Sequence, residues 1–193
     1  MPDRGDAPRS PEFWTKLLSL IDAELSEPHE MVIVGGAAIG LRYTKKHVTG
    51  DIDSVTPSSD RKLWAAVQRA CRAMQEAEGL AKPPKVSTSA VFDPPEDWES
   101  RQVTLRLGLK NLIVRVPEQH DLAISKVSRG LGRDYAALKA MHEAKPLRLR
   151  TPWSGTARRG ASVSATLGGS RRTSSCSWRR CSAMRLRTSS SRI

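Results

Sequence analysis

A short strand that ends in two glycines and is followed by a strand with two aspartates constrains this chain more than any other feature. Residues 31–34 are apolar and mostly β-branched, and they lead directly into Gly35 and Gly36. This pattern predicts a buried strand, a tight backbone turn and then a short helix. Further along, polar residues alternate around Ile52. That alternation predicts a second strand with Asp51 and Asp53 on one face.

These two strands together predict a nucleotide site that works with a metal. Two carboxylates at positions i and i+2 of a strand can share a divalent cation through hard oxygen ligands, which suits Mg²⁺. Adjacent glycines let backbone N–H groups approach a phosphate closely at a helix start, where the helix dipole also favours anions. We therefore expect Mg²⁺ to bridge the protein and the triphosphate of an NTP.

The same residues resemble a known signature. Val34-Gly35-Gly36-Ala37-Ala38, followed by Thr49-Gly50-Asp51-Ile52-Asp53, resembles the motif of the DNA polymerase β-like nucleotidyltransferase superfamily. Within it, residues 121–126 with Arg129 and Arg133-Asp134 are similar to a segment of small bacterial nucleotidyltransferases. These include uncharacterised nucleotidyltransferase-like proteins and the abortive-infection toxin enzymes of toxin–antitoxin systems. The resemblance covers residues 10–143.

The resemblance implies a role for each matching residue. Asp51 and Asp53 would ligate Mg²⁺ and, with Asp134, form the catalytic set, while Gly35, Gly36 and Lys126 would bind the nucleotide phosphates. The chain departs from the superfamily pattern at two places. Ala37 stands where many members carry serine, and the strand predicted at 111–116 lacks the third metal-binding carboxylate. The toxin-like members suggest Asp134 as its substitute.

Each motif also has a structural interpretation that involves no chemistry. The glycine pair serves equally well as a tight turn, and the two aspartates as solvated edge-strand acids, although aspartate is poorly suited to strands. Lys126, Arg129 and Arg133 fit the solvent face of a helix. Arg42, Lys45 and Lys46 form a basic stretch that either steers phosphate or is merely solvated. Among the histidines, His47 alone lies near the predicted site.

The remaining periodicity predicts an α+β fold, with a small mixed sheet of the nucleotidyltransferase type flanked by helices. Trp14 and Trp64 lie on apolar stripes and are predicted to be core residues. In the helix expected after Pro117, the inward-facing residues are predicted to be Leu122, Ile124 and Val127. The next helix is predicted to run through Tyr135, Leu138 and Met141. The predicted helices are 11–25, 37–43, one that Gly79 ends, one from 117, and 133–143; the predicted strands are 31–34, 49–56, 86–92, 102–107 and 111–116.

The charge of the chain is concentrated at one end. The formal net charge is +12, but residues 151–193 hold nine basic and no acidic residues. That segment is also rich in serine and threonine, so residues 149–193 are predicted to be a disordered basic tail after a domain at 10–148 and a flexible stretch at 1–9. Such a tail is a candidate nucleic-acid binder. Alternatively, it is not the native frame: GC-rich codons for 176–184, shifted by one base, encode the helix-like LLEALFGD.

Several classes are excluded on composition. The longest apolar run, 31–41, is about half of what a membrane-spanning helix needs, and no secretory signal is visible. The three cysteines form no CxxC pair, which disfavours a disulfide scaffold or a zinc site. We expect a cytoplasmic protein that does not enter a membrane.

Function follows from the carboxylate and glycine motifs. The leading prediction is a Mg²⁺-dependent nucleotidyltransferase that moves a nucleoside monophosphate from an NTP to a hydroxyl of an RNA, such as tRNA, or of a protein. A role as a toxin with an antitoxin partner is one candidate. The alternative is a catalytically inactive nucleotide-binding or regulatory module, which the missing third carboxylate and Ala37 favour.

Overall fold

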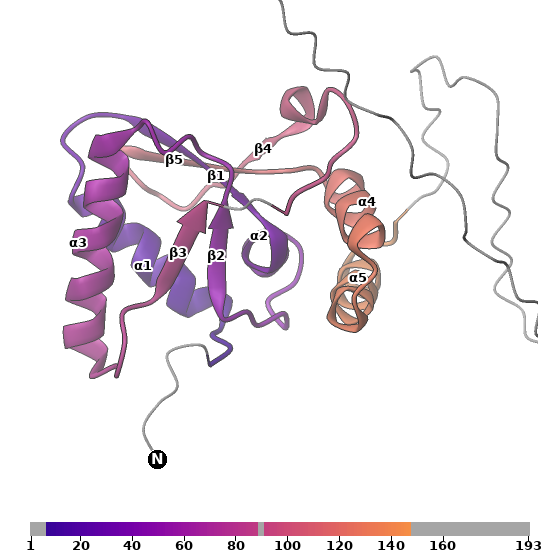
Figure 1. Ribbon diagram of the computed structural model, residues 1–193, viewed down its shortest axis with the longest axis horizontal. Helices are drawn as coiled ribbons and strands as arrows, with labels where there is room; N and C mark the ends of the chain where they lie inside the picture. The colour runs from indigo at the N-terminus through magenta and orange to yellow at the C-terminus, as the bar shows by residue number, and fades with distance from the viewer. Residues whose placement is uncertain (1–6, 89–90, 148–193) are drawn as a thin grey trace, which may run out of the picture. The chain divides into compact units, whose positions relative to one another are not determined.

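The computed structural model describes residues 7–88 and 91–147, which form an α+β fold around one five-stranded sheet (Figure 1). The predicted fold class is confirmed. The sheet order is β3-β2-β1-β5-β4. The strands are β1 (His29–Val34), β2 (Asp51–Ser54), β3 (Lys85–Thr88), β4 (Val103–Thr104) and β5 (Leu112–Val116). The predicted tail at 149–193 and most of the predicted flexible N-terminus lie outside the described residues.

The sheet is mixed, with β1 near its centre. β1 pairs parallel with β5 and antiparallel with β2, while β2 pairs parallel with β3 and β4 antiparallel with β5. In the β1–β2 register, Ile33 lies opposite Ser54 and Val34 opposite Asp53. Directly opposed residues share a face of the sheet. The aspartates of β2 therefore lie on the same face as Val34.

Within residues 7–88 and 91–147, five α-helices and one short 3₁₀ helix pack around the sheet. They are α1 (Pro11–Ala23), α2 (Gly35–Arg42), α3 (Arg61–Glu78), η1 (Trp98–Arg101), α4 (Gln119–Arg129) and α5 (Gly132–Ala144). Ser10 caps α1 by accepting a hydrogen bond from the Phe13 N–H, and Asp60 caps α3 through the Leu63 N–H. Gly79 ends α3 in the left-handed conformation, as expected of a glycine after a helix. Local sequence thus determines these boundaries.

One face of the sheet carries the hydrophobic core. The apolar faces of α1 and α3 pack together with Met31, Ile33 and Val114 in one buried cluster. Trp14 is buried there as predicted, whereas Trp64 is only partly buried and donates its indole N–H to the Pro57 carbonyl. Figure 1 shows α4 and α5 on the side of the sheet opposite α3. The second face of the sheet is therefore the one that α4 and α5 approach.

The prediction of which residues face inward in the helix after Pro117 was right for Leu122 and wrong for Ile124 and Val127. Leu122 is buried, but Ile124 is 41% and Val127 59% exposed. The buried face of α4 instead carries polar side chains, namely Asp121, Ser125 and Lys126. Ion pairs and hydrogen bonds offset the free-energy cost of burying these polar groups. Apolar periodicity alone cannot reveal such a face.

Several predicted boundaries shifted as well. The helix at 11–25 ends at Ala23, and the short helix begins at Gly35 itself, two residues earlier than expected. The strand predicted at 86–92 is β3 at 85–88, and the strand predicted at 102–107 pairs only over 103–104. In the described part of the chain, no helix combines the length and apolar character needed to cross a membrane.

Candidate active site

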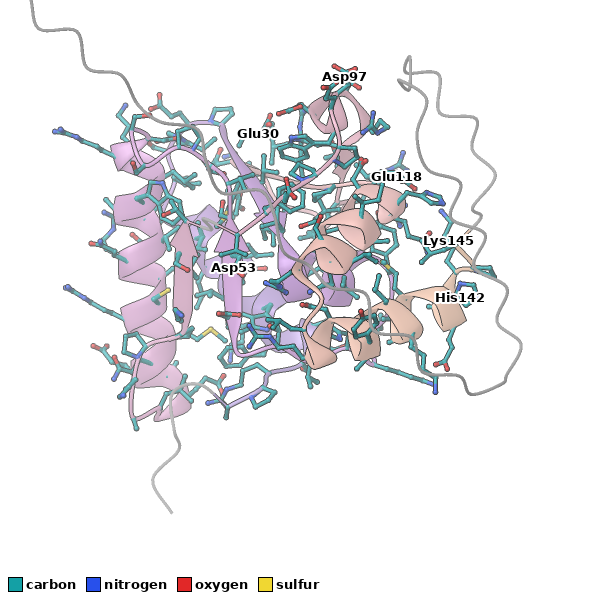
Figure 2. All side chains as sticks on the ribbon, turned by 45° about the vertical axis from the view of Figure 1, so that its right-hand side comes forward. Glu30, Asp53, Asp97, Glu118, His142 and Lys145 are labelled. Carbon is teal, nitrogen blue, oxygen red and sulfur yellow. The ribbon has the colours of Figure 1, made fainter. Side chains whose placement is uncertain are left out.

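The carboxylates of Asp51 and Asp53 lie on β2 beside the point where β1 turns into α2. Asp53 is opposite Val34, the residue just before the glycine pair. Figure 2 shows Asp53 between the sheet and the α4–α5 pair. Gly35 has a φ of +68°, and a Cβ added there would come within 3.3 Å of Asp53 Oδ2. Glycine is therefore needed at this position both for backbone conformation and for close approach.

Gly36 is held close to the loop that precedes β2. A Cβ at this position would lie 2.8 Å from Thr49 Oγ1 and 3.2 Å from His47 Nε2. The Thr49 hydroxyl in turn donates a hydrogen bond of 3.4 Å to Asp51 Oδ1. The glycine pair thus brings the start of α2, the 47–49 loop and the aspartates together, which a simple tight turn would not require.

The beginning of α2 is suited to an anion. Val34 at the N-cap forms no side-chain hydrogen bond to the helix. The first N–H groups of a helix have no partner within the helix, and the helix dipole adds positive potential there. A phosphate at this position would accept those N–H groups.

The two aspartates repel each other. Burial raises the pKa of Asp53, and the nearby charge of Asp51 raises it further. Lys85 offsets part of this repulsion, since its Nζ lies 3.7 Å from Asp51 Oδ2. A bound cation would relieve the repulsion between the two carboxylates. Both groups are hard oxygen donors, so the pair fits Mg²⁺.

A buried cluster of charges on α4 and α5 faces the aspartates. Asp134 is 1% exposed and accepts hydrogen bonds from Lys126 Nζ at 3.1 Å and Arg129 Nε at 2.9 Å. Asp134 also accepts a hydrogen bond from the Leu131 N–H and so helps to cap the start of α5. Arg129 above all, and Lys126 with it, hold the pKa of Asp134 well below its usual range. Both oxygens of Asp134 are thus engaged by these two cations.

Asp53 and the two cations, Lys126 and Arg129, line one small pocket. Its walls include Gly35, Asp53, Phe92, Lys126 and Arg129, whereas Asp134 stands behind the two cations and is not part of the lining. Burial lowers the pKa of Lys126, while the Asp134 carboxylate opposes that shift. Lys126 is therefore not on the solvent face of its helix, and the fold brings it to the predicted site.

Some lining residues escaped sequence analysis. Phe92 is the last residue of the strand predicted at 86–92, and nothing in that pattern indicated a place in the site. Ser125 precedes Lys126 and accepts a hydrogen bond of 3.2 Å from the Asp93 N–H, which secures that segment to α4. The adjacency of Ser125 to Lys126 in a motif was the only signal available. His47 contacts the glycine turn, and burial lowers its pKa.

A third carboxylate is absent from β5, the strand predicted at 111–116, and β3 beside β2 carries none either. Ser87 of β3 lies opposite Asp53. Within residues 7–88 and 91–147, no group of three or more His, Cys, Asp or Glu side chains could hold a metal ion. Mg²⁺ is commonly bound by one or two carboxylates together with substrate phosphates and water. Asp51 and Asp53 suffice for that form of binding.

A mixed sheet, a paired-carboxylate strand beside a glycine turn and facing cations on a helix together define a nucleotidyltransferase-type domain. Comparison with protein families agrees. The chain belongs to a family of nucleotidyltransferases of unknown function (DUF6036), whose model matches residues 15–148. Searches of curated proteins and of solved structures returned no match.

Proposed function

We propose that this protein is a Mg²⁺-dependent nucleotidyltransferase of the polymerase β-like type, which transfers a nucleoside monophosphate from an NTP to a hydroxyl of an RNA or a protein. The observation that carries the proposal is the position of Asp53, which lies beside Gly35 and lines one pocket with Lys126 and Arg129. A carboxylate for a metal and cations for phosphates thus line the same pocket, and Asp51 lies two residues from Asp53 on β2. The NTP substrates are abundant in the cytoplasm, where we expect the reaction.

Each residue would have a separate task. When bound between Asp51, Asp53 and the phosphates, Mg²⁺ would supply Lewis-acid stabilisation of the charge that develops on the triphosphate. The N–H groups at the start of α2 would hold phosphate oxygens. Lys126 and Arg129 would neutralise the leaving pyrophosphate from the opposite side. Asp134 would act indirectly, as a positioning residue, by fixing both cations.

Label transfer tests the proposal. The wild-type protein, Mg²⁺ and each α-³²P-labelled NTP would be incubated with bulk tRNA or with a protein extract. We expect label on one acceptor class and at least a 100-fold lower rate in Asp51→Ala/Asp53→Ala. Glu143→Gln, on the exposed end of α5, is the matched control and should retain the rate. Equal labelling by the double variant would rule out the assigned carboxylates.

The second candidate is a nucleotide-binding module without turnover. The absence of a carboxylate from β5, where the superfamily pattern has its third metal ligand, and Ala37 in place of serine favour it. Calorimetry distinguishes the two functions: binding of Mg·NTP without label transfer to any acceptor supports the module, and absence of binding contradicts both.

A toxin role is a further proposal, based on the similarity of the 121–134 segment to toxin-like members. Induced expression in a bacterial host should then arrest growth, and Asp51→Ala/Asp53→Ala should relieve the arrest. A neighbouring gene product that also restores growth would be the antitoxin. Equal toxicity of the double variant would contradict this role.

A further inference from the structure

A second groove lies on the same face of the sheet as Asp53. It has a volume of about 440 Å³, and its lining includes Glu30, Asp60, Trp98 and Glu99. Val32 lines this groove, whereas Val34 lines the pocket at Asp53. Residues i and i+2 of a strand point to the same side and are about 7 Å apart. The second groove and the Asp53 pocket are therefore neighbours along β1.

Two aromatic rings stand between these sites. Phe92 lines the Asp53 pocket and Trp98 lines the second groove, and their rings meet edge to face with centroids 4.9 Å apart. The segment that carries them is secured to α4, because Arg101 Nη2 donates to the buried carboxylate of Asp121 at 2.8 Å. The shared aromatic wall is thus a fixed part of the surface.

The second groove is acidic. Among the residues that the structure describes, no lysine or arginine lines it. Glu30 is paired with Arg115 at 3.1 Å and Asp60 with His29 at 2.8 Å, but Glu99 forms no salt bridge within the described part of the chain. The segment around Glu99 carries three more carboxylates without a salt bridge there, those of Asp93, Glu96 and Asp97. Figure 2 shows Glu30 and Asp97 at the same end of the molecule.

This charge discriminates between the two acceptor classes. An RNA bound across the second groove would place phosphates beside the unpaired carboxylate of Glu99 and the acidic segment that carries it, and like charges at short range are repelled. A lysine or arginine side chain would instead find the indole of Trp98 and a carboxylate, groups that attract cations through cation–π contact and charge-assisted hydrogen bonding. The groove therefore favours a basic protein segment.

We propose that the second groove binds a lysine or arginine side chain of a protein acceptor, and that the hydroxyl to be modified lies two residues away, at the Asp53 pocket. In an extended peptide, side chains two residues apart on one side are separated by about 7 Å, which equals the step from Val32 to Val34. This inference rests on the proposed nucleotidyl transfer.

The transfer itself is balanced. The acceptor hydroxyl oxygen forms a bond to the α-phosphorus of the NTP, while the bond from that phosphorus to the oxygen bridging to the β-phosphate breaks. Pyrophosphate leaves with the electron pair of the broken bond, and the hydroxyl proton passes to water. The product is a phosphodiester between the acceptor side chain and the nucleoside.

Two measurements test the proposal. Fluorescein-labelled peptides with serine and arginine two residues apart, in either order, would be compared by fluorescence anisotropy with peptides carrying alanine or glutamate in place of arginine. At low ionic strength, we expect at least tenfold tighter binding of an arginine peptide to the wild-type chain. Glu99→Lys and Trp98→Leu should each remove that preference. Glu143→Lys, the same charge change on α5, should keep it.

Label transfer supplies the second readout. The arginine peptide should accept label at least tenfold faster than the alanine peptide, and tRNA should compete poorly. Equal binding of the three peptides, or preferential labelling of tRNA that Glu99→Lys leaves unchanged, would overturn the proposal. Calorimetry with Mg·NTP separates the two levels: if no NTP binds, nucleotidyl transfer itself fails, whereas peptide anisotropy still reports on the second groove.

Discussion

The ammonium group of Lys126 lies 3.1 Å from a carboxylate oxygen of Asp134, and the two side chains are only 8% and 1% exposed. This pair joins α4 to α5 and keeps a cation buried at the edge of the Asp53 pocket. Its burial explains why polar residues occupy the inner face of α4. The same ion pair therefore stabilises the packing of α4 on α5 and places a positive charge at the Asp53 pocket.

Removal of the Asp134 charge should be strongly destabilising. Asp134→Asn leaves Lys126 buried without a counter-charge, and breaking a buried pair in this way costs about 3–5 kcal/mol. Lys126→Met in the same chain should recover part of that loss, because the unpaired charge is then gone. Urea unfolding of the two single variants and the double variant measures the coupling. Additive losses would show that the pair does not act as a unit.

Mg²⁺ should stabilise the wild-type protein through the aspartate pair. At ten times its dissociation constant the ion adds about 1.4 kcal/mol to the free energy of unfolding. Asp53→Asn should abolish this gain but, without Mg²⁺, should not lower stability. The pKa of Asp53 is raised by burial and by Asp51, so its ionised form destabilises the fold at neutral pH. Thermal unfolding with Mg²⁺ and with EDTA checks both points; an unchanged Mg²⁺ response in the variant would contradict them.

The two glycines should differ in their response to alanine. Gly35→Ala suffers from the positive φ, which costs about 1–2 kcal/mol, and from the approach of Asp53 Oδ2. Gly36→Ala suffers only from the contact with Thr49 and His47. Thr49→Gly should therefore rescue the melting temperature of Gly36→Ala but not that of Gly35→Ala. Rescue of both, or of neither, would argue against these contacts.

Truncation along α4 should follow burial and not apolar character. Leu122 is 1% exposed and Val127 is 59% exposed. Leu122→Ala should cost about 2–5 kcal/mol, whereas Val127→Ala should change stability by less than about 0.5 kcal/mol. Chemical denaturation of both variants measures these changes in the free energy of unfolding. A large loss for Val127→Ala would mean that its exposed face is covered in solution.

Acid should weaken the contact between α1 and β5. Asp22 accepts the N–H groups of Lys110, Asn111 and Leu112. Burial opposes its ionisation, but these hydrogen bonds outweigh burial and lower its pKa. A depressed pKa gives stability above the unfolded value, about 3.9 for aspartate, that is lost as the pH falls below it. Asp22→Asn should therefore lose more stability at pH 7 than at pH 3. A pH-independent difference in urea unfolding would contradict this assignment.

Much of the fold could be predicted because short stretches of sequence determine where its helices begin, end and face the core. The Ser10 and Asp60 caps, Gly79 after α3 and the apolar stripe that buries Trp14 depend on residues within a few positions of one another. The α+β class followed from the order of such elements. Strand lengths could not be predicted, because the two-residue β4 and the four-residue β3 are defined by their partners in the sheet.

Part of the candidate site could also be predicted, because some of its residues lie close together in the sequence. Gly35, Gly36, Asp51 and Asp53 form compact motifs whose chemistry is evident without a structure. Phe92 and the acidic segment over the second groove gave no such signal, because their importance depends on what lies across from them.

The sequence by itself determined the glycine turn, the carboxylate strand and their common face, since backbone periodicity and the special conformations of glycine are local properties. Only the tertiary structure decided where Lys126, Arg129 and Asp134 belong. Burying these charges is favourable only when the partners meet in space, and α4 and α5 bring them together. Long-range packing therefore turned an apparently solvated basic helix into one wall of the site.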